Sequence, residues 1–325
     1  MGKAENKGKS TRGRKIKMVL LIILGVYVGI TLISTIVNQI LSRNELAGIE
    51  PTGQLVEVFG KNMHIRSMGD GEHTIVILPG MGTALPSTSF APLMRELATE
   101  HTVVIIDYFG TGFSDQTDVP RTNANVVEEV RAALSAGGFS APFILMPHSA
   151  SGTTADYFAI RHPDEITALV LLDTVPTHEH TEMNTSEAIV QLTRFTQFIG
   201  TPRLFGGVMA RLGGITVDNG FTVEEIRDIR RFMNHEVNPT SMNRVRVYHD
   251  TIHEVVALDF PQDIPVLSIR PTRPNVGARP EHGEAHMQRY GEGSQMIILE
   301  GNHNIHKGNH AEIREAINAF LGEQQ

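Results

Sequence analysis

The sequence around Ser149 predicts an activated serine nucleophile. Residues 145–152 read Leu-Met-Pro-His-Ser-Ala-Ser-Gly, at the end of an apolar run that begins at Pro142. A buried strand that leads through a tight turn into a helix, with Ser149 on the turn, has the layout of a nucleophile elbow. The usual form is G-x-S-x-G, whereas here Pro147 and Ser151 flank the serine. Because a serine hydroxyl is a poor nucleophile at neutral pH, Ser149 requires a base nearby.

Other residue types that carry chemistry form weaker patterns. Three histidine-containing segments have ligand-like spacing, but none matches H-E-x-x-H, so the sequence predicts no metal site: His178-Glu179-His180, His282–His286 and His303–His306. Gly110-Thr111-Gly112 lacks the third glycine of a dinucleotide fingerprint, and no cofactor is predicted. Cysteine is absent, which excludes a thiol nucleophile and a disulfide framework.

The elements that must position Ser149 are short apolar runs that alternate with helical patterns. Eight runs bounded by turn residues predict strands: Gln54–Val58, Met63–Ser67, Thr74–Pro79, Thr102–Asp107, Pro142–Pro147, Ala168–Asp173, Pro265–Arg270 and Gln295–Leu299. The later runs are nearly continuous Val, Ile and Leu, which is typical of parallel strands covered on both faces. Helical patterns lie between them: Phe90–Glu100, Asn125–Ala136, Thr153–Arg161 and His310–Leu321. This alternation predicts an α/β fold with a mostly parallel, doubly wound sheet.

The alternation stops between Thr177 and Ala257, where only helical signals occur. Thr222-Val223-Glu224-Glu225 fits a capping box that opens a helix toward Met233, and Ser241–Val256 is a further helical stretch. An all-helical insertion after the sixth strand is interpreted as a lid. Its large apolar residues suggest an apolar acyl or alcohol group in the substrate, although packing in the core of the lid is the more common role of such residues: Phe195, Phe198, Leu204, Phe205 and Met209.

The first 49 residues have a composition of their own. Seven basic residues and one acidic residue occupy positions 1–17, and positions 18–40 then run without a formal charge. At about 1.5 Å per residue this run spans roughly 34 Å, enough for a hydrocarbon core of about 30 Å. We therefore predict a cytoplasmic tail (1–17), a transmembrane anchor (18–40) and a linker (41–49). A cleaved signal peptide and a buried helix are the alternatives.

The anchor divides the charge of the chain into two unlike parts. The basic flank predicts that the tail stays in the cytoplasm and that residues 50–325 lie on the exoplasmic side of the cell membrane. Of 28 basic and 36 acidic residues, 21 and 35 lie beyond residue 17, which leaves that part with a net charge of −14. Such an acidic domain makes nucleic acid an unsuitable partner.

Four motifs in order resemble the α/β-hydrolase fold superfamily over roughly residues 50–322. Ile75–Gly82 resembles the strand and loop that supply half of the oxyanion hole, with Pro79 in place of the usual histidine. Asp107–Asp115 resembles the D-x-x-G-x-G-x-S turn of that family, where the aspartate is mostly structural. The elbow at Ser149 is the third motif, and Glu300-Gly301-Asn302-His303 resembles the Gly-x-His loop after the last strand.

The resemblance implies roles for three residues around the serine. His303 would take the proton of Ser149 and later return it, because an imidazole titrates near neutral pH. His306 and His310 lie close by in sequence and are its rivals. Backbone N–H groups of Met81 and Ala150 would hold the oxyanion.

The acid that orients the histidine is the open member of the site. Most relatives place it about five residues after the strand that matches Pro265–Arg270, but residues 271–275 contain no carboxylate. The other location used in the superfamily is the end of the preceding core strand, which here is Asp173. The alternatives are a site without an acid, in which the amide of Asn275 could orient His303, and Glu281 or Glu284, which need a longer loop. The sequence analysis selects Asp173.

Together these features predict a membrane-anchored serine hydrolase that cleaves an ester, or an amide or thioester, through an acyl-enzyme. Its partner is a small-molecule ester or acyl substrate of apolar character. A non-catalytic binding protein with the same fold, and an acyltransferase with the same triad, are the two alternatives, because fold alone does not select a function.

Overall fold

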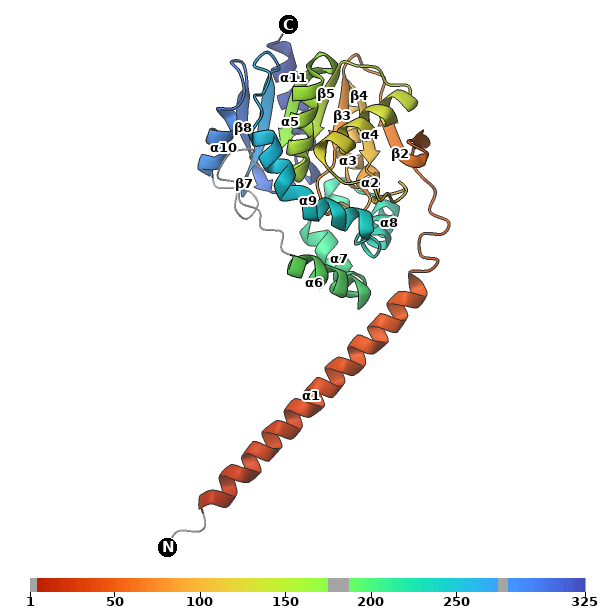
Figure 1. Ribbon diagram of the computed structural model, residues 1–325, viewed down its shortest axis with the longest axis vertical. Coiled ribbons are helices and arrows are strands. Elements are labelled where there is room, and N and C mark those ends of the chain that lie inside the picture. Colours follow the sequence, from red (N-terminus) through yellow and green to blue (C-terminus); the bar gives the residue numbers. More distant parts are fainter. Residues whose placement is uncertain (1–4, 175–186, 274–279, 325) are drawn as a thin grey trace.

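All eight predicted strands are present and form one sheet in the computed structural model, which describes residues 5–174, 187–273 and 280–324 (Figure 1). The strands are β1 (Gln54–Val58), β2 (Lys61–Met68), β3 (Thr74–Leu78), β4 (Thr102–Asp107), β5 (Phe143–Pro147), β6 (Ile166–Leu172), β7 (Val266–Arg273) and β8 (Gln295–Asn302).

The order of the strands brings three turns of the chain to one edge of the sheet. The order is β1-β2-β4-β3-β5-β6-β7-β8, and β1 and β2 pair antiparallel. β2 also pairs antiparallel with β4, whereas every pairing from β4 through β3 to β8 is parallel. Because parallel strands end at a common edge, the segments that follow β5, β6 and β8 lie near one another.

Helices cover both faces of the sheet because alternate strand residues point to opposite sides. Ile75 and Ile77 of β3 belong to the core shared with α3 (Ala91–Leu97) and α11 (His310–Gly322), whereas Val76 and Leu78 face α4 (Asn123–Ala136) and α5 (Gly152–Arg161). All four side chains are fully buried, and each such burial stabilises the fold by about 1.5–3 kcal/mol relative to an exposed side chain. Two short helices, α2 (Pro86–Ser89) and α10 (Pro280–Met287), complete this part of the chain.

Residues 187–256, between β6 and β7, form the helical insertion that the sequence predicts. It contains α6 (Glu187–Phe198), α7 (Thr201–Leu212), η3 (Val217–Asn219), α8 (Val223–Met233) and α9 (Pro239–Val256). The predicted capping box is present, since Thr222 Oγ1 accepts from the Glu225 backbone N–H at 3.1 Å and Glu225 Oε2 accepts from that of Thr222 at 2.9 Å. The predicted start of the insertion at Thr177 lies outside the described residues.

One expectation for the insertion is wrong. Phe195, Phe198, Leu204, Phe205 and Met209 do not pack inside it, because their side chains are 53–59% exposed. The insertion instead buries Val190 of α6, Gly206 and Ala210 of α7, and Ile229 and Phe232 of α8. The apolar residues of α6 and α7 therefore face away from the domain.

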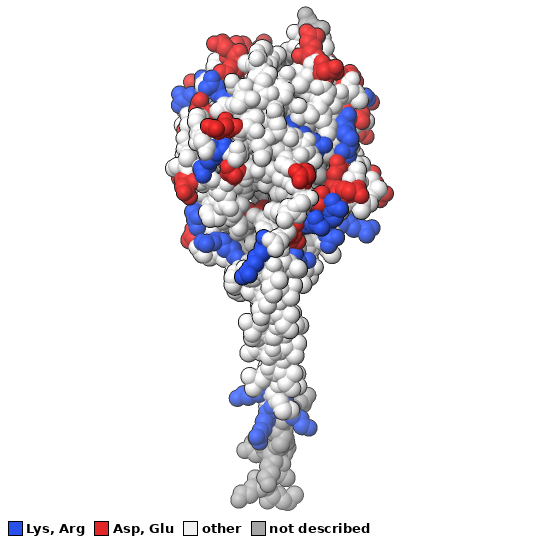
Figure 2. Space-filling view, turned by 90° about the vertical axis from the view of Figure 1, so that its right-hand side faces the viewer, with Lys and Arg blue, Asp and Glu red and all other residues white. Residues whose placement is uncertain are grey.

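The first helix, α1 (Glu5–Leu41), projects from the domain as a separate rod (Figure 1). Its segment Gly13–Leu41 has a mean hydropathy of 2.6 in its most apolar window, none of which is buried, so it is long and apolar enough to cross a membrane. Figure 2 shows an uncharged stem between Lys and Arg side chains at its lower end and the charged surface of the domain. The predicted span 18–40 lies within this helix.

Candidate active site

The turn after β5 holds Ser149 in a conformation that few residues adopt. The φ angle of Ser149 is 55°, in the left-handed region, and its side chain lies at the start of η1 (Ser149–Ser151), which leads directly into α5. A non-glycine residue in this region is strained, and the surrounding structure must hold it there. The strain places the side chain at the edge of the sheet rather than in the strand or the helix.

The departure from G-x-S-x-G at Ser151 has a local explanation. Ser151 replaces the second glycine and donates its Oγ–H to the carbonyl of Pro79 at 2.5 Å, so its side chain ties the elbow to the loop after β3. The residue that must be glycine is instead Gly152, one position after Ser151. A Cβ on Gly152 would lie 2.8 Å from Cβ of Thr174, closer than real Cβ atoms come. The elbow helix therefore packs against the segment after β6 only with glycine at 152.

The loop after β3 approaches the serine as an oxyanion loop must. A Cβ on Gly80 would lie 2.9 Å from Cβ of Ser149 and 3.1 Å from the carbonyl oxygen of His148, so only glycine fits. Met81 follows it and packs against a small apolar cluster formed by Ala150 with Tyr248 and Ile252 of α9. The two predicted oxyanion residues thus belong to one cluster with residues of α9.

His303 bridges the serine and a carboxylate. Its Nε2 lies 2.9 Å from Ser149 Oγ, and its Nδ1 lies 2.6 Å from Asp173 Oδ2. With the proton on Nδ1, which donates to the carboxylate, Nε2 accepts the hydrogen bond from the serine hydroxyl. Three residues from the turns after β5, β6 and β8 thereby form one chain of hydrogen bonds. The arrangement allows the imidazole to take the serine proton.

Asp173 is fixed more tightly than an ordinary residue at the end of a strand. Its φ is 39°, its side chain is 1% exposed, and its backbone N–H donates to the carbonyl of Ile269 at 2.9 Å. Its second oxygen, Oδ1, lies 3.7 Å from the guanidinium of Arg270 on the neighbouring strand β7. Burial lowers the pKa of Arg270, and the charge of Asp173 counteracts this effect. The carboxylate is therefore held by the backbone and by an opposite charge.

Neither alternative acid is seen to contact His303 in the described part of the chain. Glu284 lies on α10 with an exposed side chain. Asn275 and the side chain of Glu281 lie outside the described residues.

The rival histidines occupy other places. His306 is 2% exposed and stacks on Phe90 with ring centroids 4.2 Å apart, and burial holds its pKa well below the usual range. It packs beneath the His303 loop as a neutral ring. His310 begins α11, where burial lowers its pKa.

His148 is a participant that sequence reasoning missed. It is 5% exposed, and its Nε2–H donates to the carbonyl of His303 at 3.0 Å. Burial, with repulsion from His303 as the second cause, lowers the pKa of His148 to about 3, so it stays neutral. It therefore holds the His303 loop without adding a charge beside the imidazole. The only signal in the sequence is its place directly before Ser149.

Asp107 behaves as a structural residue, in line with its interpretation from the sequence. Its carboxylate accepts hydrogen bonds from the backbone N–H groups of Ser87 at 2.8 Å and Phe113 at 3.2 Å. It also pairs with Nδ1 of the buried His64 at 2.9 Å. These contacts organise the turn after β4, away from the serine.

Helix α9 of the insertion contacts the elbow, which sequence reasoning also missed. The guanidinium of Arg244 donates to Ser151 Oγ at 2.9 Å and lies 4.5 Å from the ring centroid of Tyr108. One turn later, Tyr248 is 2% exposed and its hydroxyl has no hydrogen-bond partner within the described part of the chain. The insertion thus reaches the residues beside the nucleophile.

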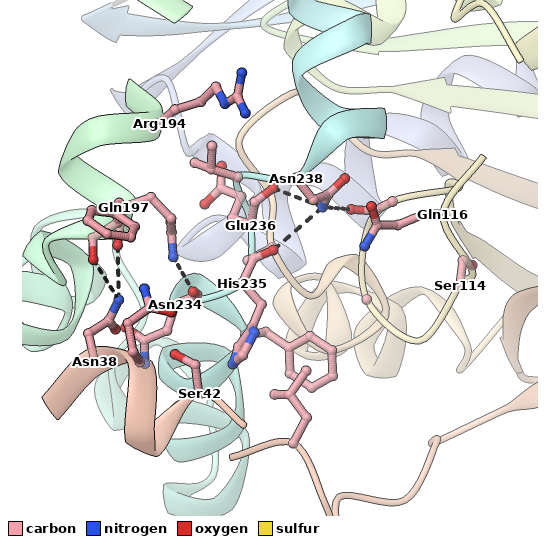
Figure 3. A pocket seen from close by; sticks show the side chains of 18 residues that line it. Asn38, Ser42, Ser114, Gln116, Arg194, Gln197, Asn234, His235, Glu236 and Asn238 are labelled. Atoms are coloured by element: carbon pink, nitrogen blue, oxygen red, sulfur yellow. Dashed lines mark hydrogen bonds between the residues drawn. The ribbon is translucent and has the colours of Figure 1, made fainter. Parts of the chain in front are cut away.

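A cavity of about 580 Å³ lies between the end of α1, the loop after β4 and residues 232–238. Figure 3 shows the polar side chains of Asn38, Gln197 and Asn234 meeting on one side of it. The described residues that line it do not include Ser149 or His303, so it is distinct from the triad. Glu236, labelled in the same view, also lines a second cavity of about 420 Å³ next to α6 and α7.

The described residues contain no group of three or more His, Cys, Asp and Glu side chains that suits a metal ion. The segment His178-Glu179-His180 lies outside them.

Comparisons with known proteins agree with the fold. A family model described as alpha/beta hydrolase fold matches residues 73–204. An uncharacterized protein, YbdG, of Bacillus subtilis is 35% identical over 131 residues, which are 40% of this chain and 40% of that protein. A pimeloyl-[acyl-carrier protein] methyl ester esterase of Chromobacterium violaceum is 33% identical over 115 residues, 35% of this chain and 42% of that protein. The matched segments therefore span about two fifths of these relatives.

A solved structure shows the likeness over most of the domain. The enol-lactonase from Burkholderia xenovorans LB400 superposes with a TM-score of 0.58 at 20% sequence identity. The match covers 83% of this chain and 100% of that chain. At this identity the likeness concerns the fold.

Proposed function

This chain belongs to the α/β-hydrolase fold superfamily, and we propose that it is a serine hydrolase that cleaves an ester through an acyl-enzyme. The observation that carries the proposal is the hydrogen-bonded chain from Ser149 through His303 to Asp173, with contacts of 2.9 and 2.6 Å. It supplies the nucleophile, the base and the orienting acid that acyl transfer requires. No step requires a cofactor.

In the first half of the reaction, Ser149 Oγ attacks the ester carbonyl while His303 Nε2 takes its proton. The negative charge that develops on the carbonyl oxygen is held by the backbone N–H groups of Met81 and Ala150, and such donors contribute about 3–4 kcal/mol each. Asp173 stabilises the imidazolium that forms. His303 then gives its proton to the alkoxide, the alcohol leaves, and the acyl group stays on Ser149.

In the second half, a water molecule attacks the acyl-enzyme. His303 takes a proton from this water, and the same two N–H groups hold the second oxyanion. Collapse of the intermediate returns the proton to Ser149 Oγ and releases the carboxylic acid. Atoms balance as ester plus water giving alcohol plus acid.

The proposed substrate is an ester with an apolar acyl or alcohol part. The cavity of about 420 Å³ is lined by Phe205 and Met209 of α7 and by Met233, and at Glu236 it meets the oxyanion loop, where Glu236 Oε1 would lie 3.5 Å from a Cβ on Gly82. The insertion then acts as a lid that covers the elbow, in keeping with the contacts of Arg244 and Tyr248. An ester is preferred to an amide because one matched relative is named as a methyl ester esterase.

We also propose that α1 is an uncleaved anchor with the tail in the cytoplasm and the domain on the exoplasmic side. The support is the apolar segment Gly13–Leu41 and the excess of Lys and Arg before it. Protease added to intact cells or spheroplasts should digest the domain and spare a tag at the N-terminus. Protection of the domain would contradict this topology, and a soluble mature form that begins near residue 40 would favour a cleaved signal.

The test of the hydrolase proposal is a panel of p-nitrophenyl esters of rising chain length, assayed with the full chain in detergent. We expect a pre-steady-state burst of p-nitrophenol, best with a medium or long acyl chain, and no burst from Ser149→Ala. Analysis of the products with added alcohols and amines separates hydrolysis from acyl transfer. Tight binding of an ester without turnover would instead support a non-catalytic binding protein.

A further inference from the structure

Helices α6 and α7 expose more apolar surface than a soluble domain would. Six large side chains define what we term the α6–α7 face, and each is 53–61% exposed: Leu192, Phe195, Phe198, Leu204, Phe205 and Val208. On α7, Leu204, Phe205 and Val208 recur with the spacing of one helix face, and the buried Gly206 and Ala210 lie opposite. Contiguous apolar patches of this kind mark a surface that binds something.

The end of the apolar rod is fixed to this face. Ser34 Oγ donates to the carbonyl of Ile199 at 2.7 Å, in the turn between α6 and α7. Asn38 Nδ2 donates to the carbonyls of Gln197 and Phe198 at 3.1 and 3.2 Å. Gly200 permits this approach, since a Cβ there would lie 2.9 Å from Cβ of Asn38. The position of the face along α1 is therefore defined.

That position corresponds to the surface layer of a bilayer. The apolar helix ends at Leu41, so Ser34 and Asn38 lie inside the apolar segment by about 5–10 Å at 1.5 Å per residue. Amphipathic helices that lie in a membrane surface bury their apolar side to about the same depth, 5–10 Å. If α1 crosses the membrane, the turn between α6 and α7 reaches the level of the acyl chains. Figure 1 shows both helices at the end of the domain from which α1 projects.

Basic residues with exposed side chains lie on and beside the elements that form the face. Arg43 follows α1, and Arg194 and Arg211 lie on α6 and α7 with exposed side chains. Arginine side chains in this place extend toward phosphate groups while their stems remain in apolar surroundings.

The cavity of about 420 Å³ opens beside the same face. Its lining includes Thr196 of α6, Phe205 and Met209 of α7, and Glu236, whose Oε1 would lie 3.5 Å from a Cβ on Gly82 in the loop after β3. The cavity therefore gives an acyl chain at the face an apolar path toward Glu236, beside the loop after β3.

We propose that the α6–α7 face rests in the surface layer of the bilayer that α1 spans, and that the enzyme takes its ester from that bilayer. The substrate class is thus a lipid-borne ester rather than one dissolved in water. This inference rests on the proposed anchor and on the proposed hydrolase activity.

The absence of tryptophan from the chain offers a direct test, because one introduced Trp is the only indole that fluoresces. Three full-chain variants are reconstituted in nanodiscs that contain brominated phosphatidylcholine: Phe205→Trp on the face, Leu24→Trp in the middle of α1 and Ile298→Trp on β8. Ile298 is a matched control because its side chain is 61% exposed on the far part of the domain.

We expect lipid brominated near the headgroup end of its chains to lower the fluorescence of Phe205→Trp about twofold, as for a side chain at the membrane surface. Leu24→Trp should respond most to bromine near the methyl ends, and Ile298→Trp should not respond. The inference would be overturned if Leu24→Trp is quenched while Phe205→Trp is quenched as weakly as Ile298→Trp. An unquenched Leu24→Trp would overturn the anchor, and the inference with it.

Activity gives a second readout. In the double variant Leu192→Ser/Leu204→Ser, kcat/KM should fall about tenfold more for an ester carried in phosphatidylcholine vesicles than for a water-soluble ester. The control Leu55→Ser, whose side chain is 48% exposed on β1, should lower neither selectively. Equal losses on both esters would contradict a role in membrane contact. If the wild type hydrolyses none of the esters, the hydrolase proposal is refuted. The quenching experiment would still show whether the α6–α7 face lies in the bilayer surface.

Discussion

The edge of the sheet and the helical insertion use apolar residues in opposite ways. Around the site, the side chains of β3, β5 and β6 are buried almost throughout, and the polar residues at their ends are fixed by hydrogen bonds. In α6 and α7, most large apolar side chains are exposed and few residues are buried. Burial holds the geometry of the candidate site in the first region, and exposure leaves the second available for the proposed contact with substrate or membrane. Substitutions in the two regions should therefore fail in different assays.

The largest effect should come from the nucleophile and its base. Ser149→Ala and His303→Ala should each lower kcat on the order of 10⁴–10⁶. Neither side chain is part of the buried core, so thermal unfolding should change little. The measurements are steady-state kinetics and a melting curve for each variant. Retained activity in His303→Ala together with loss in His306→Ala would show that the base is the other histidine.

The acid should have the next largest effect. Asp173→Asn keeps the size of the side chain but no longer fixes the imidazole tautomer, and kcat should fall by up to about 10⁴. Glu284→Gln is the matched control because its carboxylate is exposed on α10, and it should remain near wild type. Normal kinetics of Asp173→Asn would contradict its assignment as the triad acid.

How much of this site could be predicted from the sequence depends on how far apart along the chain the interacting residues lie. The strands were predictable because runs such as Val103–Ile106 are buried on both faces, and the elbow because Ser149 directly follows one of them. Helix α10 was not predicted, since its eight residues contain Pro280, Gly283 and no apolar period.

Contacts between distant segments required the order of the strands. The pairing of Asp173 with Arg270 exists because β6 and β7 are neighbours in the sheet. Likewise, the hydrogen bond from His148 to the carbonyl of His303 joins residues 155 positions apart. The sequence also contains the apolar residues of α6 and α7, but their spacing does not say whether the domain, a substrate or a membrane covers them.

A smaller effect is expected from the close approach behind the serine. Gly80→Ala places a methyl group 2.9 Å from Cβ of Ser149, so the oxyanion loop must shift. We expect kcat to fall about 10²–10³-fold, comparable to the loss of one oxyanion donor, with KM little changed. Gly322→Ala is a control, because Gly322 at the end of α11 has no atom within 4 Å of its Cβ position and no positive φ. Equal kinetics of the two variants would contradict this account of the loop.

The smallest effect concerns stability and belongs to the insertion. The carboxyl group of Glu236 has no hydrogen-bond or ion-pair partner among the described residues, and burial raises its pKa from 4.5 to about 7. As pH rises above 4.5, the unfolded chain releases this proton before the folded one, so the wild type loses stability until about pH 7 and then no further. Glu236→Gln avoids this loss. Its free energy of unfolding should exceed that of the wild type by up to about 3 kcal/mol at pH 8 and by almost nothing at pH 4.

Urea unfolding in detergent micelles at the two pH values measures this difference. An advantage of Glu236→Gln that is the same at both values would show that the carboxyl group is not desolvated in the folded protein.

The most direct measurement of the central claim is covalent labelling with a fluorophosphonate, followed by mass spectrometry of the peptides. A serine activated by His303 attacks the phosphorus and releases fluoride, which leaves one adduct per chain. We predict that the adduct lies on Ser149, that Asp173→Asn slows its formation, and that Ser149→Ala abolishes it. Absence of labelling in the wild type, or an adduct on another residue, would contradict the assignment of Ser149 as the nucleophile.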